Sequence, residues 1–240
     1  MAYPLSRLGL SDMTECGAAL RRLGHQAASM EEAAGAVVRW LYDNLDDGAG
    51  ERACAMVRFY KTHEYRALPA DLATFAQNAA DGDIAPQTRC LTLLATVGVE
   101  PEWNDRRLSR GHQAIPLKSA EAIRQLPMIL QLVQQLGFDP EHLAASDPAL
   151  LVDTRERTFN VFYVPEALGS PFIPAQDGFV RKYGIASVLG FGGLLPPADL
   201  FAVILFSRVA IPQETAELFK PLSLSARMAV LPFSGGRVFT

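Results

Sequence analysis

Apolar residues recur at helical spacing near the start of the chain and again in its middle. Between residues 11 and 44 the pattern predicts two helices, or one helix broken near Gly24, with Ser29 as the N-cap of the second part. Further along, apolar positions that share one helical face predict a single helix that Ser119 caps and Gly137 ends. The chain therefore carries long amphipathic helices on both sides of its first strands.

Runs of apolar, β-branched and aromatic residues predict the strands of a sheet. Some alternate between polar and apolar positions, whereas the last pair is apolar on both faces, which is typical of the centre of a sheet covered on two sides. The "PPAD" turn at residues 196–199 joins that last pair as a hairpin. The predicted strands are residues 52–60, 90–100, 149–153, 158–164, 187–195 and 200–208.

Prolines mark the expected boundaries of elements in the last third of the chain. Residues 165–183 are rich in aromatic side chains and contain three prolines, so we expect a lid with a short helix near residues 176–183. Pro212 predicts the start of a last helix, and Pro221 predicts a kink in it.

The glycine cluster "GFGG" at residues 190–193 does not read as a phosphate-binding loop. Such a loop leads directly into a helix N-terminus, where free amides hold the anion, and it carries either GxGxxG spacing or the lysine of a P-loop. Here the glycines lead into another strand. The cluster instead indicates a strand that bends or that another group approaches closely.

Composition narrows the class of protein. A chain of 240 residues with 49% hydrophobic content is sufficient for one large core. Its net charge of −4, with scattered basic residues, does not indicate nucleic-acid binding. No stretch has the pattern of a signal peptide or of a membrane span, so we expect no membrane association. Three dispersed cysteines indicate reduced thiols and a cytoplasmic protein.

Two long segments resemble a known family of sensory domains. The stretch "YGIASVLGFGGLLPPADLFAVILFSR" with the later "ETAELFKPLSLSARMAV" is similar to the final strands and closing helix of GAF domains. The stretches "CLTLLATVGVEPEWNDRRLSRGHQAIPL" and "TFNVFYVPEALGSPFIPAQDGFVRKYGIASVLGFGG" resemble GAF-like input modules found ahead of bacterial histidine kinases and cyclases. The resemblance implies an α+β fold with a GAF/PAS-like central antiparallel sheet flanked by helices. It also implies an N-terminal helical extension at 1–28, a sensory domain at 29–233 and a tail at 234–240.

The same resemblance implies a function in bacterial signal transduction. A small ligand would bind in a lidded pocket, and helices at 11–45 and 212–230 would pair in a homodimer that signals to a kinase or cyclase type output, as in two-component systems. We do not expect an enzyme. Nothing after Phe233 resembles an output domain, so the chain is either a fragment or acts on a partner protein.

The predicted pocket lies between the strand at 158–164, the lid at 165–183 and the inner face of the hairpin. The same aromatic side chains could instead fill a solid core, which would make the chain a ligand-free dimerisation module. The ligand stays open at this stage: a cyclic nucleotide, haem, a small aromatic compound or none. The candidate ligand-binding residues are Phe162, Tyr163, Phe172, Gln176, Phe179, Tyr183 and Phe191.

Two histidines and one polar loop are further candidates. His63 and His112 could coordinate haem iron or another metal, although neither has metal-motif spacing and both could be surface or capping residues. The loop that contains Trp103, with several arginines and serines up to Gly111, could bind an anion or could be a solvated loop anchored by a buried tryptophan.

The cysteines allow a different class of function. Cys54 and Cys90 fall on adjacent predicted strands, where they either pack as small apolar side chains or form a redox-sensing pair. Some free-standing GAF proteins are thiol-dependent reductases, but their cysteines cluster, whereas Cys16, Cys54 and Cys90 are dispersed. No cysteine follows Cys90, which excludes a covalently attached bilin in the lid region.

Overall fold

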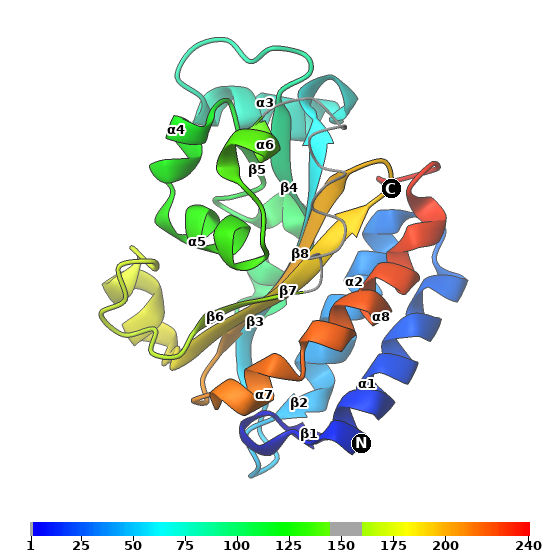
Figure 1. The fold of residues 1–240 in the computed structure, drawn as a ribbon, viewed down its shortest axis with the longest axis vertical. Helices are drawn as coiled ribbons and strands as arrows, with labels where there is room; N and C mark the ends of the chain where they lie inside the picture. Colours follow the sequence, from blue (N-terminus) through cyan, green and yellow to red (C-terminus); the bar gives the residue numbers. More distant parts are fainter. Residues whose placement is uncertain (1, 145–159) are drawn as a thin grey trace.

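The computed structural model describes residues 2–144 and 160–240, and a six-stranded antiparallel sheet forms its centre (Figure 1). The strand order across the sheet is β5-β4-β3-β8-β7-β6, so the long strands β3 and β8 lie in the middle. The strands are β3 (Cys54–Glu64), β4 (Arg89–Gly98), β5 (Ala114–Pro116), β6 (Val161–Val164), β7 (Ser187–Leu195) and β8 (Asp199–Ser207). This arrangement confirms the expected α+β fold with a central antiparallel sheet flanked by helices.

Three long helices cover one face of the sheet. They are α1 (Leu10–Leu23), α2 (Met30–Asn44) and α8 (Lys220–Val230), which lie together in Figure 1, and α7 (Gln213–Glu217) precedes α8. Ser29 caps α2 as predicted, because its hydroxyl accepts a hydrogen bond from the Glu32 amide. The apolar faces of these helices share one buried cluster with Val57 and Phe59 of β3.

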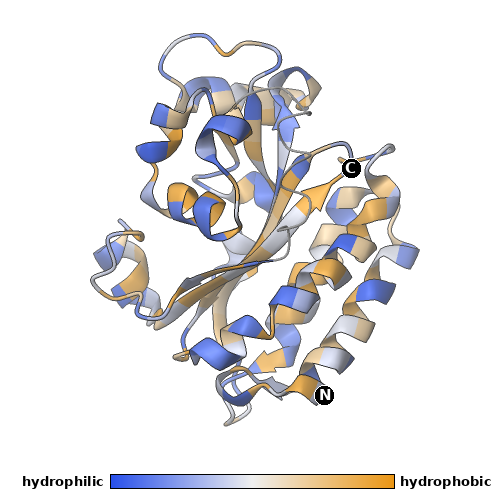
Figure 2. Ribbon diagram, viewed as in Figure 1, coloured by the Kyte–Doolittle hydropathy of each residue, from blue (hydrophilic) through white to orange (hydrophobic). Residues whose placement is uncertain are grey.

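Shorter helices and the aromatic segment cover the other face. They are α4 (Ala120–Arg124), α5 (Pro127–Gln135), α6 (Pro140–Ala144) and a π-helix at Gln176–Arg181, while α3 (Ala70–Ala79) packs near β5. In Figure 2 the central strands are largely apolar in colour and the covering helices alternate apolar and polar positions. The sheet is therefore covered on both sides, as the apolar hairpin strands predicted.

The remaining elements are short. A two-residue strand β1 (Tyr3–Pro4) pairs in parallel with β2 (Leu45–Asp46) beside the helix layer. Single turns of 3-10 helix link the longer elements, at Leu5–Arg7, Gly24–Gln26, Tyr65–Ala67, Pro101–Asn104, Arg106–Leu108 and Leu231–Phe233. None of the helices in residues 2–144 and 160–240 combines the length and the apolar composition that a membrane crossing needs.

Prolines divide two helices that the apolar periodicity predicted as continuous. The helix expected between Ser119 and Gly137 is two helices, because Pro127 lacks an amide hydrogen and begins α5 anew. Likewise, Pro221 does not kink the last helix but occupies the first turn of α8, where proline is well tolerated. The strand β5 was not predicted, and the strand predicted at 149–153 lies outside the described residues.

The glycines of β7 confirm the strand interpretation of "GFGG". A Cβ atom on Gly192 would lie 2.1 Å from the carbonyl oxygen of Phe201 on β8, which is far inside van der Waals contact. Gly190 leaves room for the ring of Phe162 on β6. The cluster therefore allows close packing of neighbouring strands and does not form an anion-binding turn.

The N-terminal and C-terminal segments of the chain both contact the central domain. Cys16 and Leu20 of α1 are buried in the helix-side cluster together with α2 and α8. At the other end, the amides of Met30 and Glu31 donate to carbonyl groups of residues 237–238. Residues 2–28 and 234–240 are thus in contact with the central domain, and the separation of 1–28 and 234–240 as distinct units stays a prediction.

Candidate functional site

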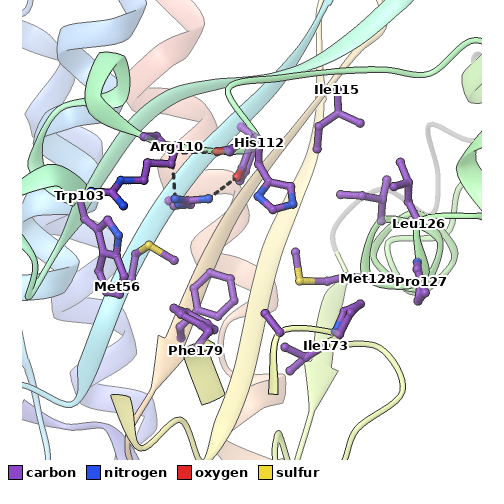
Figure 3. A pocket seen from close by; sticks show the side chains of 18 of the residues that line it. Met56, Trp103, Arg110, His112, Ile115, Leu126, Pro127, Met128, Ile173 and Phe179 are labelled. Atoms are coloured by element: carbon purple, nitrogen blue, oxygen red, sulfur yellow. Dashed lines mark hydrogen bonds between the residues drawn. The ribbon is translucent and has the colours of Figure 1, made fainter. Parts of the chain in front are cut away.

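A cavity of about 340 Å³ lies on the side of the sheet covered by α4 and α5 (Figure 3). Its floor is β3 and β8, and its walls are the loop at 102–112, the start of α5 and residues 173–179. Most of the lining is apolar. The apolar side chains include Met56, Trp103, Met128, Ile129, Phe179 and Phe206. A volume of this size suits a small organic molecule.

Strand alternation explains which residues of β3 reach the cavity. Successive side chains of a strand point to opposite faces, so Met56, Arg58 and Tyr60 face the cavity while Val57 and Phe59 face the helices. The alternation at 52–60 predicted the strand correctly. It also carried a signal that the sequence interpretation missed, since an arginine lies between two apolar positions on one buried face.

Arg58 is the main polar group in this apolar lining. Its side chain is buried, with Nη1 donating to Tyr60 Oη at 3.1 Å and Nη2 donating to Ser109 Oγ at 3.1 Å. The Nε atom is buried and has no hydrogen-bond partner among the described residues. Both partners of Arg58 are neutral, and within residues 2–144 and 160–240 no carboxylate forms an ion pair with it. Its positive charge is therefore not compensated by the described protein groups.

His112 lies at the same polar end of the cavity (Figure 3). Its backbone adopts a left-handed conformation with φ of 62°, which is uncommon for a residue other than glycine. Loss of solvation, and secondly the positive charge of Arg58, lower the pKa of His112 below its ordinary value of 6.5. Arg58 and His112 thus line the same space, and the positive charge of Arg58 disfavours protonation of His112.

The loop that carries these groups is fixed by aromatic and ionic contacts. Trp103 packs edge-on against Tyr183, with ring centroids 4.6 Å apart, and against Phe179 at 5.8 Å. Arg106 binds Glu31 of α2 at 2.7 Å, which ties the loop to the helix layer at the edge of the sheet. Trp103 is half-buried and is held by these two aromatic contacts, and the loop forms one wall of the cavity.

Most of the predicted ligand-binding residues do not line this cavity. Phe179 lines the cavity, and Tyr183 supports its wall through Trp103. Phe172 packs in the same cluster, and the Gln176 amide group donates to the carbonyl oxygens of Ala167 and Ile173, which holds the lid segment together.

The other three predicted residues do not reach this cavity. Phe162 is fully buried in the sheet core, and the Tyr163 hydroxyl donates to the Ile211 carbonyl group. Phe191 lies on the opposite face and packs against Phe219 of the helix layer, with centroids 5.6 Å apart. Residues 173–179 of the lid contribute a wall, but no residue of β6 or β7 is among the described residues that line the cavity.

His63 and His112 do not form a common metal site. His63 is buried against Phe239 of the C-terminal segment, and neither of its ring nitrogens has a hydrogen-bond partner among the described residues. Burial lowers the pKa of His63 well below 6.5, with the nearby Lys61 charge adding to the effect. In the described parts of the chain no three histidine, cysteine or acidic side chains are grouped as metal ligands.

The three cysteines are buried and unpaired. Burial raises the pKa of the Cys16 and Cys54 thiols to about 12 and that of Cys90 to about 11. A thiol with so high a pKa is protonated at neutral pH, whereas thiol catalysis needs an accessible thiolate. The geometry thus favours cysteines that pack as small apolar side chains.

Comparison with known proteins yields likeness in fold only. No protein-family model matches the sequence, and no curated protein matches it. Among solved structures, the chain is similar to the GAF domain of a phosphoenolpyruvate-protein phosphotransferase from Coxiella burnetii, at 11% identity and a TM-score of 0.46, covering 93% of this chain and 94% of that one. A GAF domain from an Acinetobacter phosphoenolpyruvate-protein phosphotransferase matches at 10% identity and a TM-score of 0.41, over 90% and 91% of the two chains.

A third similar structure is the phycoerythrobilin-bound GAF domain from a cyanobacterial phytochrome. It matches at 12% identity and a TM-score of 0.41, covering 95% of this chain and 96% of that chain. None of these likenesses assigns a ligand, a partner or an activity to this chain.

Proposed function

We propose that this chain is a signal-sensing GAF-like module of the bacterial cytoplasm that binds a small ligand in the cavity between β3, the 102–112 loop and α5. The observation that carries the proposal is the cavity itself, whose apolar lining surrounds one buried charged group. Ligand sites in proteins have this composition, with apolar walls and a few fixed polar groups. Ligand occupancy then biases an output of the kinase or cyclase type, in the same protein or in a partner.

The path from ligand to output follows β3. The strand presents Met56 and Tyr60 to the cavity and Phe59 to the cluster formed with α1, α2 and α8. A ligand that shifts β3 by a small amount therefore acts directly on the packing of the terminal helices. In this proposal the helices pair with a second copy and pass the shift on.

Ligand binding is tested by filling the cavity. Met128 lies on α5 and lines the cavity, so the Met128→Trp variant adds bulk inside it. The matched control is Gln134→Trp, which adds the same ring to an exposed position on the same helix. The readout is the thermal unfolding of each protein in the presence of N-phenyl-1-naphthylamine, a neutral apolar fluorophore, together with its fluorescence titration.

The expected result is that the wild type and Gln134→Trp bind the fluorophore while Met128→Trp binds at least about tenfold more weakly. Equal binding by all three proteins, or failure of the wild type to bind both this fluorophore and its sulfonated analogue 8-anilinonaphthalene-1-sulfonate, would remove the cavity as a ligand site. The chain would then act as a ligand-free dimerisation module. A thiol-dependent reductase is not favoured by either outcome, because Cys16, Cys54 and Cys90 are all buried.

A further inference from the structure

The cavity contains one positive charge that the described protein groups leave uncompensated. Besides Tyr60, the ionisable side chains that line it among the described residues are Arg58, Glu102, Arg110 and His112. Glu102 and Arg110 form an ion pair at 2.7 Å at the exposed mouth, so their charges cancel. The positive charge of Arg58 remains.

Burial makes this uncompensated charge costly. Only 8% of the Arg58 surface is exposed, and its two hydrogen-bond acceptors, Tyr60 Oη and Ser109 Oγ, are neutral. A buried ion without a partner of opposite charge is strongly unfavourable, and such groups are ordinarily paired or bound to a ligand. Tyr60 and Ser109 fix the orientation of the guanidinium group but accept only two of its five N–H donors. Nε–H is among the donors that have no acceptor in the described residues.

We propose that the ligand of this cavity is an organic monoanion with a compact oxyanion head, such as a carboxylate, which Arg58 binds, and a largely apolar body that fills the space between Met56, Met128 and Phe179. This inference rests on the proposed ligand-binding function. One uncompensated cation matches one negative charge, and the planar guanidinium fork matches the two oxygens of a carboxylate. The apolar walls match the body of such a molecule.

Other groups near Arg58 favour the same class of ligand. The Ser109 hydroxyl donates to the Gly111 carbonyl group at 2.8 Å and so keeps its lone pairs toward Arg58. The loop at 102–112, which the sequence left open as an anion-binding or a solvated loop, thereby holds Arg58 in place and closes the polar end of the cavity. A dianion or polyphosphate is disfavoured, because only one cation is available inside the apolar lining.

The test compares two fluorophores of nearly the same shape. The first is 8-anilinonaphthalene-1-sulfonate, which carries one oxyanion head, and the second is N-phenyl-1-naphthylamine, which lacks it. We expect the wild type to bind the anion at least about tenfold more tightly than the neutral compound, as a charge-assisted hydrogen bond to a buried guanidinium would produce. In Arg58→Gln the preference for the anion disappears while binding of the neutral compound stays within about twofold.

Three variants separate the roles of the arginines. Arg58→Lys keeps the charge but not the fork, and it retains part of the preference. Arg110→Gln removes the arginine at the mouth and shows whether that residue carries the preference in place of Arg58. Arg124→Gln is the control: Arg124 lies on α4, is exposed, is paired with Glu141 and is absent from the cavity lining, and this variant keeps the preference of the wild type. In competition, decanoate displaces the anionic fluorophore from the wild type and decanamide does so at least about tenfold less well.

The outcomes of the two proposals are distinguishable. If the wild type binds both fluorophores equally and Met128→Trp weakens both, the cavity is a ligand site and the monoanion inference is wrong. If Arg110→Gln abolishes the preference and Arg58→Gln does not, the assignment to Arg58 is wrong. If neither fluorophore binds the wild type, the proposed function and the inference fail together. Because the wild-type comparison needs no variant, misfolding of Arg58→Gln does not leave the inference untested.

Discussion

At the scale of single residues, the two faces of β3 carry different chemistry. Arg58 faces the cavity with neutral partners, whereas His63 faces the C-terminal segment and packs on Phe239. Lys61 is also buried, and loss of solvation lowers its pKa although Asp199, at 2.7 Å, opposes that shift. These positions show that the strand holds ionisable groups at three buried sites in different states: Lys61 is paired with a carboxylate, burial lowers the pKa of His63, and Arg58 has only neutral partners among the described residues.

The buried histidine predicts a dependence of stability on pH. The unfolded chain binds a proton at His63 near pH 6.5, whereas the folded chain does so only well below that value, because burial disfavours the charged ring. Between these two pKa values the unfolded state holds more protons, so the contribution of His63 to stability is present above pH 6.5 and is lost as the pH falls. The loss amounts to about 1.4 kcal/mol per pH unit in that window.

Urea unfolding between pH 7 and pH 5 measures this effect. In His63→Gln the slope of the unfolding free energy against pH becomes smaller than in the wild type, whatever the absolute stability of the variant. The exposed His25 provides the control variant His25→Gln, whose slope stays that of the wild type. An unchanged slope in His63→Gln would show that the buried ring does not cause the loss of stability at acidic pH.

At the scale of elements, glycine and proline set the details of the fold. Pro127 and Pro221 each begin a helix where apolar periodicity alone predicts continuation, because a proline in the first turn needs no hydrogen-bonded amide. The glycines of β7 permit a close approach to β8 and β6. Regular periodicity therefore located the elements, while these two residue types decided where they end and how closely they pack.

A pair of glycine substitutions tests this distinction. In Gly192→Ala the added methyl group meets the Phe201 carbonyl oxygen, so we expect a loss of about 1–3 kcal/mol in the free energy of unfolding. In Gly35→Ala, on α2, the methyl group meets no atom within 4 Å, and the better helix propensity of alanine gives a gain of about 0.5–1 kcal/mol. Chemical denaturation followed by circular dichroism measures both changes, and effects of the same sign would contradict the argument.

At the scale of the whole molecule, the proposed signal depends on association of the helix layer. Leu224 and Met228 lie one turn apart on α8 and are 48% and 46% exposed, which gives this helix an apolar surface outside the core. In the proposed homodimer this surface meets a second copy. The cavity lies on the other side of the sheet, so ligand and partner do not compete for the same residues.

The association is measured by light scattering after size exclusion at high micromolar concentration. We expect a dimer for the wild type and a monomer for Leu224→Glu and Met228→Glu, because a buried carboxylate at an apolar contact is unfavourable. Leu168→Glu is the control, since Leu168 is 47% exposed but lies in the lid segment. A monomeric wild type at that concentration would remove the dimer from the proposed mechanism.

The sequence by itself determined the fold class and most elements, because hydrophobic periodicity and the N-caps Ser29 and Ser119 are local properties of the chain. It left open whether the Trp103 loop binds an anion or is a solvated loop. The cavity, by contrast, depends on which residues distant in sequence meet across the sheet. Phe179 lines the cavity as expected, whereas Phe191 faces the helix layer. Neighbouring residues of a strand point to opposite faces of the sheet, so an error of one residue in the register exchanges the two faces.

Only the tertiary structure decided that Arg58 is buried in an apolar lining without a carboxylate partner in the described residues. An arginine in an alternating strand is ordinarily read as a solvent-exposed position, since one face of such a strand is expected to be polar. The covering layer of α4, α5 and the 102–112 loop buries that face instead. The spacing of Met56, Arg58 and Tyr60 places the arginine on the same strand face as two large side chains, but its burial and its lack of a carboxylate partner depend on the arrangement of several elements in space.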